Sequence, residues 1–563
     1  MYRRNEQHKQ QSMFSSIEDL PEKQQKRLQD SWAETFYTEF FCRIDEDIFA
    51  VLYSADTASR PNAPINVLVG LEVLKSGFGW SDEQLEEQLA YNIQVRYALG
   101  YRDLSDGVPQ LRTVYNFRRR VSDYMQETGL NLIEQVFEQV TDEQLAALAL
   151  KSDKLRTDST LVSSNMREMS RLQLLVEVLQ RVWRMLSEVD QARYRADFEG
   201  YLKGTSGQYT YRIASGEGHT HLEAMGQLMR RLVDELAILY ADHEVYGMLV
   251  RVLREHFRLA NDQIQLKTGS EISASSLQSP DDADATFRRK RGEGHQGYVT
   301  NVTETCHPEN EVQLIVKVQT ESNTTDDAQL LNDAVPNLVE RTDVDEMYTD
   351  GGYNSPQVDD RFQNEQIEQY QTAIRGNKTA DDAIGIADFV FERDENGIPQ
   401  TVTCPQEHTS QVETTRTKAR FRADFDAEAC ATCPLLNHCP TQPLKRRPHI
   451  RRLRFDQQQV NVAHRHANRR KLKQQPNNLR TAVEATVRSL KHPFRHGKLP
   501  VRGHPRMSMM MVASAAMVNI RRIWRTASPP QPAQLAAIHR MKDEIIFGMY
   551  YVLAFLGLRC ART

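Results

Sequence analysis

Apolar and polar positions along the 563-residue chain change their period, and the change divides the chain into regions. From residue 31 to 143, apolar residues recur every three or four positions, as in amphipathic helices. Pro64 precedes one such run, Ser81–Gln84 has the sequence of a helix-capping box, and residues 111–124 form an arginine-bearing helix. These features predict a helical domain over 31–143, after a polar, mobile tail of residues 1–30.

Beyond residue 144, short runs of apolar residues alternate with polar ones, as in half-buried strands. We expect strands within residues 145–165, 297–303, 312–318, 347–350 and 370–375. A long helical stretch, about 166–285, separates the first run from the second, and a helix is expected over 327–339. The pattern predicts an α+β or α/β fold, in which helices flank a mixed sheet that contains a helical insertion.

Two acidic residues stand at informative places in the predicted strands. Asp158 lies in a segment rich in Thr, Val and Leu, with Asp153 as a rival acid on the same segment. Asp350 closes another strand and is followed by Gly351–Gly352, so the turn projects this acid beyond the sheet edge. Asn354–Ser355 then supplies a cap for a following helix. We therefore take Asp158 and Asp350 as candidate site residues.

A third acid lies among bases in the predicted helix 479–491. On a helical wheel Arg480, Glu484 and Lys491 fall within about 40° of one another, on a single face. One interpretation is an exposed ion pair between Arg480 and Glu484, which are four residues apart. The other is a site where the carboxylate holds a divalent metal and the cations hold phosphates. Three carboxylates, from Asp158, Asp350 and Glu484, can hold two Mg²⁺ ions about 4 Å apart for in-line attack on a phosphodiester.

The chain resembles bacterial insertion-sequence transposases of the DDE type, whose catalytic domain has a ribonuclease-H-like fold. The resemblance covers about residues 30–525 and is carried by four segments, which are 158–162, 280–302, 348–355 and the Arg-x3-Glu-x6-Lys segment 480–491. One branch of this family often has a Tyr three residues before the Arg, and that Tyr is linked to positioning of the DNA end. Asn477 stands there instead, which leaves the metal ligands intact.

The resemblance implies a chemistry and a partner. Asp158, Asp350 and Glu484 would bind two Mg²⁺ or Mn²⁺ ions, cut the ends of a mobile element and join them to target DNA. Phosphate contacts near the scissile bond are expected from three cations, which are Arg480, Lys491 and Arg488. The partner is double-stranded DNA, and the need to bring two element ends together implies a homodimer.

The resemblance also implies a division of the chain. The helical domain 31–143 would bind DNA, and residues 144–526 would form the ribonuclease-H-like catalytic domain. That domain contains the helical insertion 166–285 and a cysteine-containing β insertion at about 380–445. Residues 527–563 would form a C-terminal tail.

Composition and charge agree with a soluble protein that meets a polyanion. Hydrophobic residues make up 40% and charged residues 26% of the chain. The net charge of −5 conceals a basic block, since Thr441–Pro530 holds 21 Lys and Arg but two acids, Asp456 and Glu484. A basic block of this density within an acidic chain favours a polyanion bound at one face.

Four of the seven cysteines crowd one segment, with the spacing Cys-x25-Cys-x2-Cys-x5-Cys. They are candidate ligands of a structural Zn²⁺ ion: Cys404, Cys430, Cys433 and Cys439. His408 or His438 is an alternative to one thiolate. The other interpretation is a set of buried, unpaired thiols.

No secretion signal is visible, since residues 1–16 are polar, and the apolar run 545–558 is too short for a comfortable membrane span. We expect a cytoplasmic protein that acts at the nucleoid, with no membrane partner. Two other functions remain open, namely a nuclease of the same fold without strand transfer and an inactive DNA-binding relic.

Overall fold

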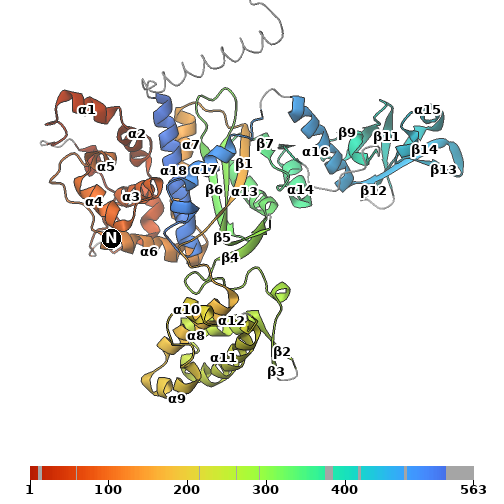
Figure 1. Ribbon diagram of the computed structural model, residues 1–563. Coiled ribbons are helices and arrows are strands. Elements are labelled where there is room, and N and C mark those ends of the chain that lie inside the picture. The colour runs from red at the N-terminus through yellow and green to blue at the C-terminus, as the bar shows by residue number, and fades with distance from the viewer. Residues whose placement is uncertain are drawn as a thin grey trace, which may run out of the picture.

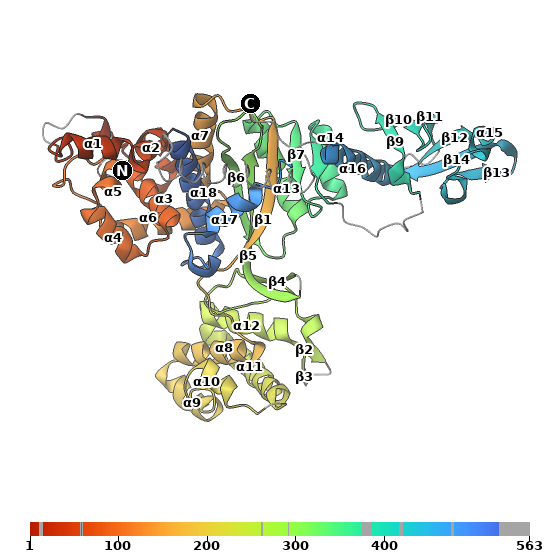
Figure 2. The same ribbon diagram turned by 45° about the horizontal axis from the view of Figure 1, so that its top comes forward.

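The computed structural model describes residues 1–10, 15–56, 58, 60–214, 216–260, 263–290, 292–373, 384–415, 420–474 and 478–527. A mixed sheet lies at the centre, with a helical domain on one side and a β-rich insertion on the other (Figure 1). A second helical body extends from one end of the sheet, and both views show the same branched arrangement (Figure 2). The central sheet is the common support of the other three parts.

The central sheet has six strands within the described ranges, in the order β4-β5-β1-β7-β8, with β6 also paired to β5. The strands are β1 (Lys154–Val162), β4 (Thr286–Lys290), β5 (Glu293–Thr305), β6 (Ile315–Ser322), β7 (Glu346–Thr349) and β8 (Glu368–Gln371). β5 runs antiparallel to β1, β4 and β6, whereas β1, β7 and β8 are parallel. The mixed α+β class predicted from the sequence is confirmed.

Several strand positions differ from the prediction, and β4 was not predicted. Residues 145–147 end a helix, and the first strand begins only at Lys154, because Leu145 is buried against the helices that cover the sheet. The expected strand 312–318 begins at Ile315, and the expected strand 370–375 ends at Gln371. An apolar run can be buried equally well at a helix end or in a strand, so the pattern alone could not place these boundaries.

Helices cover both faces of the sheet. They are α13 (Asp327–Arg341), α14 (Pro356–Asn364), α17 (Val483–Lys491) and α18 (His504–Ala527). α13 confirms the helix expected over 327–339. α18 is buried along most of its length and contacts β6 on one side and the N-terminal helical domain on the other.

The N-terminal domain is helical, as predicted. Its helices are α1 (Glu22–Gln29), α2 (Trp32–Glu39), α3 (Ile65–Phe78), α4 (Asp82–Tyr91), α5 (Ile93–Ala98), α6 (Leu111–Thr128) and α7 (Leu132–Ala147), with short 3₁₀ turns η1 (Gln7–Lys9), η2 (Phe41–Arg43) and η3 (Glu46–Leu52). α3 follows Pro64, and the capping box of Ser81 and Gln84 opens α4. Gly77 lets α3 approach α18 closely, since a Cβ there would lie 2.2 Å from Cγ of Met517. The helical domain and the sheet thus share one core through α18.

The first ten residues of the segment expected to be a mobile tail contact the helical domain. The backbone N–H of Asn5 donates to the buried carboxylate of Glu46, and the ring of His8 lies edge-on to Phe41 at 5.2 Å. The hydroxyl of Tyr2 donates to Asp47 at 2.5 Å. These contacts are made by individual groups rather than by an apolar stripe, so the polar composition gives no sign of them.

The helical insertion has a core of its own. It contains α8 (Arg171–Met185), α9 (Glu188–Phe198), α10 (Ser206–Tyr211), α11 (Gly218–Tyr240) and α12 (Glu244–His256), followed by the hairpin β2 (Phe257–Ala260) and β3 (Gln263–Leu266) and the turn η4 (Gly269–Glu271). Its buried residues form a cluster separate from the core of the sheet. Figure 1 shows this body beside β4.

The second insertion is β-rich, as predicted, and extends to residue 456 rather than 445. Its elements are β9 (Val390–Arg393), β10 (Pro399–Thr403), β11 (Thr409–Thr414), β12 (Arg420–Asp426), β13 (Gln442–Leu444), β14 (Arg447–Asp456), α15 (Ala427–Ala431), η5 (Ile386–Asp388) and η6 (Leu436–His438). α16 (Gln457–Gln474) leads back to the sheet, and η7 (Arg495–Gly497) follows α17.

Within the described ranges, no helix is both long enough and apolar enough to cross a membrane. The apolar run 545–558 and the rest of the C-terminal tail beyond Ala527 lie outside the described residues.

Candidate active site

Asp158 lies in the middle of β1, opposite Val302 of β5. Its side chain is 16% exposed, and its Oδ1 accepts a hydrogen bond from the backbone N–H of Ser159 at 3.0 Å. β5 pairs with β1 from Leu155 to Val162, whereas β7 pairs with it only from Lys154 to Arg156. Asp158 therefore lies just beyond the end of the pairing with β7, on a part of β1 that β5 holds in the sheet.

Asp350 comes directly after β7, the parallel neighbour of β1. Its Oδ1 accepts a hydrogen bond from the backbone N–H of Gly352 at 2.6 Å, so the glycine turn orients the carboxylate. Ser355 caps α14 by accepting a hydrogen bond from the N–H of Val358, as predicted for the 354–355 segment. Parallel pairing of β1 and β7 brings Asp350 close enough to Asp158 for the two negative charges to interact.

Glu484 lies in the first turn of α17, and Arg480 connects it to Asp158. Nη2 of Arg480 is 3.1 Å from Oδ1 of Asp158, and Nη1 is 3.6 Å from Oε1 of Glu484. The Glu484 side chain is 64% exposed, whereas that of Arg480 is 13% exposed. The fold thus gathers Asp158, Asp350, Glu484 and Arg480 from three distant segments of the chain.

The pKa of Asp158 is raised above its ordinary value. Burial is the largest cause, and the negative charge of Asp350 acts in the same direction. The guanidinium of Arg480 opposes both and lowers the pKa. A buried carboxylate beside a second carboxylate is an arrangement that favours a bound cation.

Arg480 does not lie on the helix where the sequence placed it. α17 begins at Val483, and Arg480 belongs to the preceding turn, where its N–H donates to Oδ1 of Asn478 at 3.1 Å. The carbonyl of Leu479 accepts a hydrogen bond from the buried Arg156 instead of from a helical N–H. That contact explains why the helix starts late, although Arg480 still reaches Glu484. Asn477 lies outside the described residues.

The other two expected phosphate ligands have different surroundings. Nζ of Lys491 lies 3.1 Å from Oγ1 of Thr160 and 3.2 Å from the carbonyl oxygen of Leu161, both on β1. Burial and the nearby charge of Lys290 lower the pKa of Lys491. Arg488 is exposed on α17. Lys491 therefore joins α17 to β1, and Arg488 has the exposure that a phosphate contact requires.

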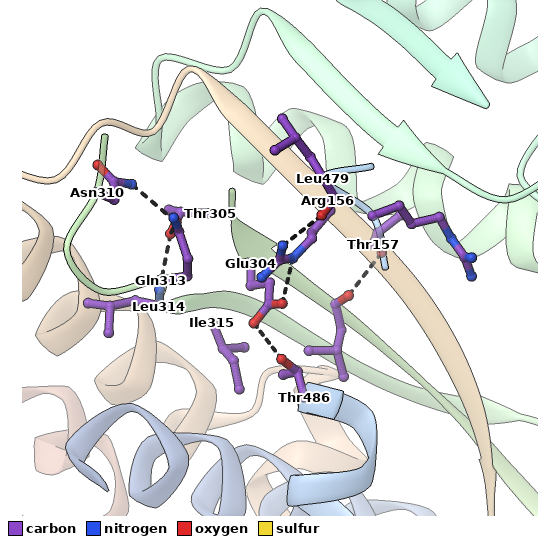
Figure 3. A network of polar contacts seen from close by, with 12 residues as sticks. Arg156, Thr157, Glu304, Thr305, Asn310, Gln313, Leu314, Ile315, Leu479 and Thr486 are labelled. Carbon is purple, nitrogen blue, oxygen red and sulfur yellow. Dashed lines mark hydrogen bonds and ion pairs between the residues drawn. The ribbon is translucent and has the colours of Figure 1, made fainter. Parts of the chain in front are cut away.

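A buried ion-pair network holds α17 in place (Figure 3). Glu304 of β5 is fully buried, and its Oε1 lies 2.7 Å from Nε of Arg156. Its Oε2 accepts a hydrogen bond from the hydroxyl of Thr486 at 2.8 Å and lies 2.7 Å from Nη1 of Arg522. Arg156 also donates to the carbonyl of Leu479 at 2.6 Å. The network ties the turn before α17, and α17 itself, to the strand that carries Asp158.

A second set of polar side chains lies beneath the acids. The hydroxyl of Tyr353, which is fully buried, donates to Oδ1 of Asn301 at 2.7 Å. Thr157 donates to the same oxygen at 3.0 Å, and Ser159 donates to Asp327 at 2.8 Å. None of these residues was predicted as part of the site. Tyr353 stood beside the Gly-Gly turn in the sequence, but nothing there indicated that it points under Asp158.

The carboxylates fit a divalent cation by their chemistry, since hard cations such as Mg²⁺ take oxygen ligands. In this arrangement Arg480 pairs with two of the carboxylates, those of Asp158 and Glu484. Among the described residues, no group of three or more His, Cys, Asp or Glu side chains is arranged to hold a metal ion. The site is therefore arranged with Arg480 as the counter-charge.

The other expected metal site is the cysteine cluster of the β-rich insertion. The four thiols of Cys404, Cys430, Cys433 and Cys439 line one small, largely apolar cavity of about 20 Å³. All are unpaired, and they are not arranged as a metal-holding group. The four cysteines are half-buried, and three of them pack against the apolar core of the β-rich insertion.

Part of the basic block is used inside the protein. Arg452 pairs with Asp424 at 2.6 Å, Arg465 pairs with Asp359, and Arg522 pairs with Glu304. In the N-terminal domain Arg118, one of the arginines of α6, is likewise paired with Glu72 and Asp82 at 2.6 Å each. The positive charge that remains for an external partner is therefore smaller than the composition suggests.

Two family models match the chain. Residues 403–524 match a model described as "Transposase DDE domain", and residues 24–120 match one described as "Transposase domain (DUF772)". The first includes the cysteines, Arg480 and Glu484, whereas Asp158 and Asp350 lie between the two matched segments. Neither a curated protein nor a solved structure matches the chain.

Proposed function

We infer that this chain is a transposase of the bacterial insertion-sequence DDE type, an enzyme that cuts and rejoins DNA. Transposase models match both the helical domain and the segment that ends in α18. The observation that carries the proposal is the position of Arg480, which lies between Asp158 and Glu484 while Asp158 lies beside Asp350. Acids from three distant segments converge at one place on the sheet, as a phosphodiester-cleaving site requires.

The sheet supports a ribonuclease-H-like catalytic domain. Three antiparallel strands, β6, β5 and β1, are followed by α13 and then by the parallel strands β7 and β8. This places one acid on the first strand and one directly after β7, with the third on a helix that returns from the β-rich insertion. We propose residues 144–526 as the catalytic domain and residues 31–143 as a DNA-binding domain, in a homodimer that acts on double-stranded DNA at the nucleoid.

The three carboxylates are proposed to hold two Mg²⁺ or Mn²⁺ ions, which when bound activate the attacking hydroxyl and stabilise the leaving oxygen. Asp158 must be ionised for this role, and Arg480 favours its ionised form. Once cations balance the acids, the guanidinium of Arg480 is free to bind a DNA phosphate, with Arg488 exposed nearby on α17. Lys491 acts by holding α17 against β1.

We propose separately that the four cysteines bind a structural Zn²⁺ ion, because four thiols around one cavity have the chemistry of such a site. Zinc content measured on the purified protein, beside a Cys430→Ser variant, decides between bound zinc and free thiols.

The test of the proposed function uses labelled double-stranded DNA that carries the flanking element ends, with Mg²⁺ or Mn²⁺. We expect cleavage at the end followed by strand joining, and loss of both with Asp350→Ala. Cleavage without joining would favour a nuclease of the same fold. Specific binding without cleavage in either protein would favour an inactive relic.

A further inference from the structure

The part of the chain that follows Glu484 is strongly basic. Residues 488–506 hold six Lys and Arg and three His, but neither Asp nor Glu. This basic segment comprises the end of α17, the loop 492–503 and the beginning of α18. Figure 1 shows α17 between β1 and α18. The basic segment therefore begins beside the candidate active site and leads away from it.

Contacts with β1 show that the basic segment follows this strand in the same direction. Nζ of Lys491 lies 3.1 Å from Oγ1 of Thr160, whose side chain shares a face of β1 with that of Asp158, since side chains alternate along a strand. Farther along, Lys498 forms a parallel bridge with Ser163. A strand rises about 3.3 Å per residue, so the path from Asp158 to Ser163 spans roughly 16 Å, or about five base pairs of a duplex.

Buried apolar residues anchor the loop of the basic segment. Phe494 is 5% exposed and Leu499 is fully buried, and both belong to the core that the helical domain shares with the sheet. The N–H of Leu499 donates to the carbonyl of Ser163 at 2.9 Å. A Cβ at Gly497 would lie 3.1 Å from Cε of Lys491, so the loop packs against α17. Because the loop is already ordered, its side chains can bind a partner at a smaller cost in conformational entropy.

Three arginines of the basic segment carry positive charge that the protein does not neutralise. Arg488, Arg495 and Arg506 are exposed, and none of them has a carboxylate partner among the described residues. Arg502 is different, because its Nη1 lies 3.5 Å from Oδ1 of Asp281. The three arginines are therefore the cations of this segment that an external polyanion can use.

The exposed face of α6 extends this positive surface onto the helical domain. Arg502 and Arg506 line a cavity of about 540 Å³ together with Tyr115 of α6. Arg112, Tyr115 and Arg119 are exposed and fall within about 60° of one another around α6. The acids in the cavity wall are already paired with cations of the helical domain. The basic segment and α6 thus form one positive surface across the joint between the sheet and the helical domain.

We propose that a DNA duplex bound at the acids continues along the basic segment to α6. Its phosphates would contact five exposed arginines, which are Arg488, Arg495, Arg506, Arg112 and Arg119. A duplex fits this surface because it carries phosphates at regular intervals over the whole path, and a guanidinium can bind each phosphate it meets. The inference rests on the proposed function, because that function places DNA at the acids.

The test measures the binding of a labelled duplex, which carries one element end, to the full-length protein without divalent metal and over a range of salt concentrations. Arg495→Gln and Arg506→Gln should each weaken binding roughly 3- to 10-fold. Each should also lower the slope of log affinity against log salt by about one, as the loss of one phosphate contact predicts. Arg112→Gln tests the extension to α6 and should have a similar effect.

Arg195→Gln is the matched control, since Arg195 is exposed on α9, which Figure 1 shows at the far end of the helical insertion. It removes the same charge and should leave both the affinity and the salt slope unchanged. Neutral methylphosphonates placed singly along the duplex then locate the contacts. The phosphate whose neutralisation no longer matters in Arg495→Gln should lie closer to the cleaved bond than the one found with Arg506→Gln.

Unchanged binding in Arg495→Gln and Arg506→Gln, an equal loss in Arg195→Gln, or the reverse order of the two phosphates would overturn the inference. Normal binding in Arg112→Gln alone would overturn the extension to α6. If element ends are cut and joined while the loop variants bind normally, the proposed function stands and only this inference fails. A protein that binds no duplex overturns both.

Discussion

Two clusters of arginines and acids include residues of β1 that are two positions apart, Arg156 in one and Asp158 in the other. The clusters differ in how their charges are balanced. Around Glu304 two arginines and a threonine bind one carboxylate, and each oxygen has a partner. Around Asp158 one arginine serves both Asp158 and Glu484, with Asp350 beside them. The first cluster is closed and buried, whereas the second is open and carries excess negative charge.

This difference separates a structural cluster from a functional one. A buried ion pair is tolerated when each charge is compensated, and then it mainly fixes the geometry of the elements that contribute to it. An under-compensated group of carboxylates disfavours its own ionised form and is stabilised by an added cation. We therefore interpret the Glu304 network as the support of α17 and the Asp158 cluster as the site of chemistry.

The largest expected effect on stability follows from removing the carboxylate of Glu304. Glu304→Ala leaves Arg156 and Arg522 without their carboxylate and should lower the free energy of unfolding by about 3–5 kcal/mol. Glu484→Ala is the matched change in the open cluster and should alter it by less than about 0.5 kcal/mol, because Glu484 is exposed. Urea denaturation of the two variants checks the comparison. Equal destabilisation by both changes would remove the distinction between the clusters.

A smaller effect should appear when the open cluster receives its cation. Mn²⁺ at a concentration about a hundred times its dissociation constant should stabilise the protein by roughly 3 kcal/mol, measured as a rise in Tm. Asp158→Asn and Asp350→Asn should each reduce that rise, and a rise unchanged in both variants would place the metal elsewhere.

The metal effect should depend on pH in a defined direction. The folded-state pKa of Asp158 lies above the ordinary value of 3.8. Without metal, the folded state binds the proton of Asp158 more tightly than the unfolded state does, so this side chain adds to the free energy of unfolding below pH 3.8. That contribution is lost as the pH rises from 3.8 through the raised folded-state pKa. Metal requires the ionised form, so the Mn²⁺-dependent rise in Tm should be complete above that pKa and decline as pH falls through it.

The smallest expected effect concerns Arg480. Arg480→Gln removes the internal counter-charge, so Mn²⁺ should bind on the order of three to ten times more tightly, which is up to about 1.4 kcal/mol. Binding of DNA should weaken at the same time, because a proposed phosphate contact is lost. Titration calorimetry with Mn²⁺ measures the first change, and weaker Mn²⁺ binding would show that Arg480 supports the metal site instead of competing with it.

The sequence was sufficient for the elements that follow periodic patterns or strong caps. The helix after Pro64, the capping box at Ser81 and Gln84, and the helix expected over 327–339 all appear, and the last of these extends to Arg341. The strand that carries Asp158 and the turn after β7 were also predicted. Each of these depends on local preferences that a short stretch of sequence contains.

What the sequence could not supply depends on contacts between distant segments. The late start of α17 follows from the hydrogen bond that Arg156 donates to Leu479, more than three hundred residues away in the chain. The role of Lys491 against β1 and the position of Tyr353 under the acids have the same origin. A helical wheel treats one element alone, so it placed Arg480 and Lys491 together although the fold gives them different partners.

The most direct test of the central claim compares acids that are close in sequence but differ in position. Asp153 precedes β1, while Asp158 lies within it, beside Asp350. Single-turnover cleavage of labelled element ends with Mg²⁺ should fall by on the order of 10³-fold or more in Asp158→Asn, Asp350→Asn and Glu484→Gln, because each removes a proposed metal ligand. Asp153→Asn should cleave at nearly the unmodified rate. Cleavage that survives Asp158→Asn and is lost in Asp153→Asn would contradict the account.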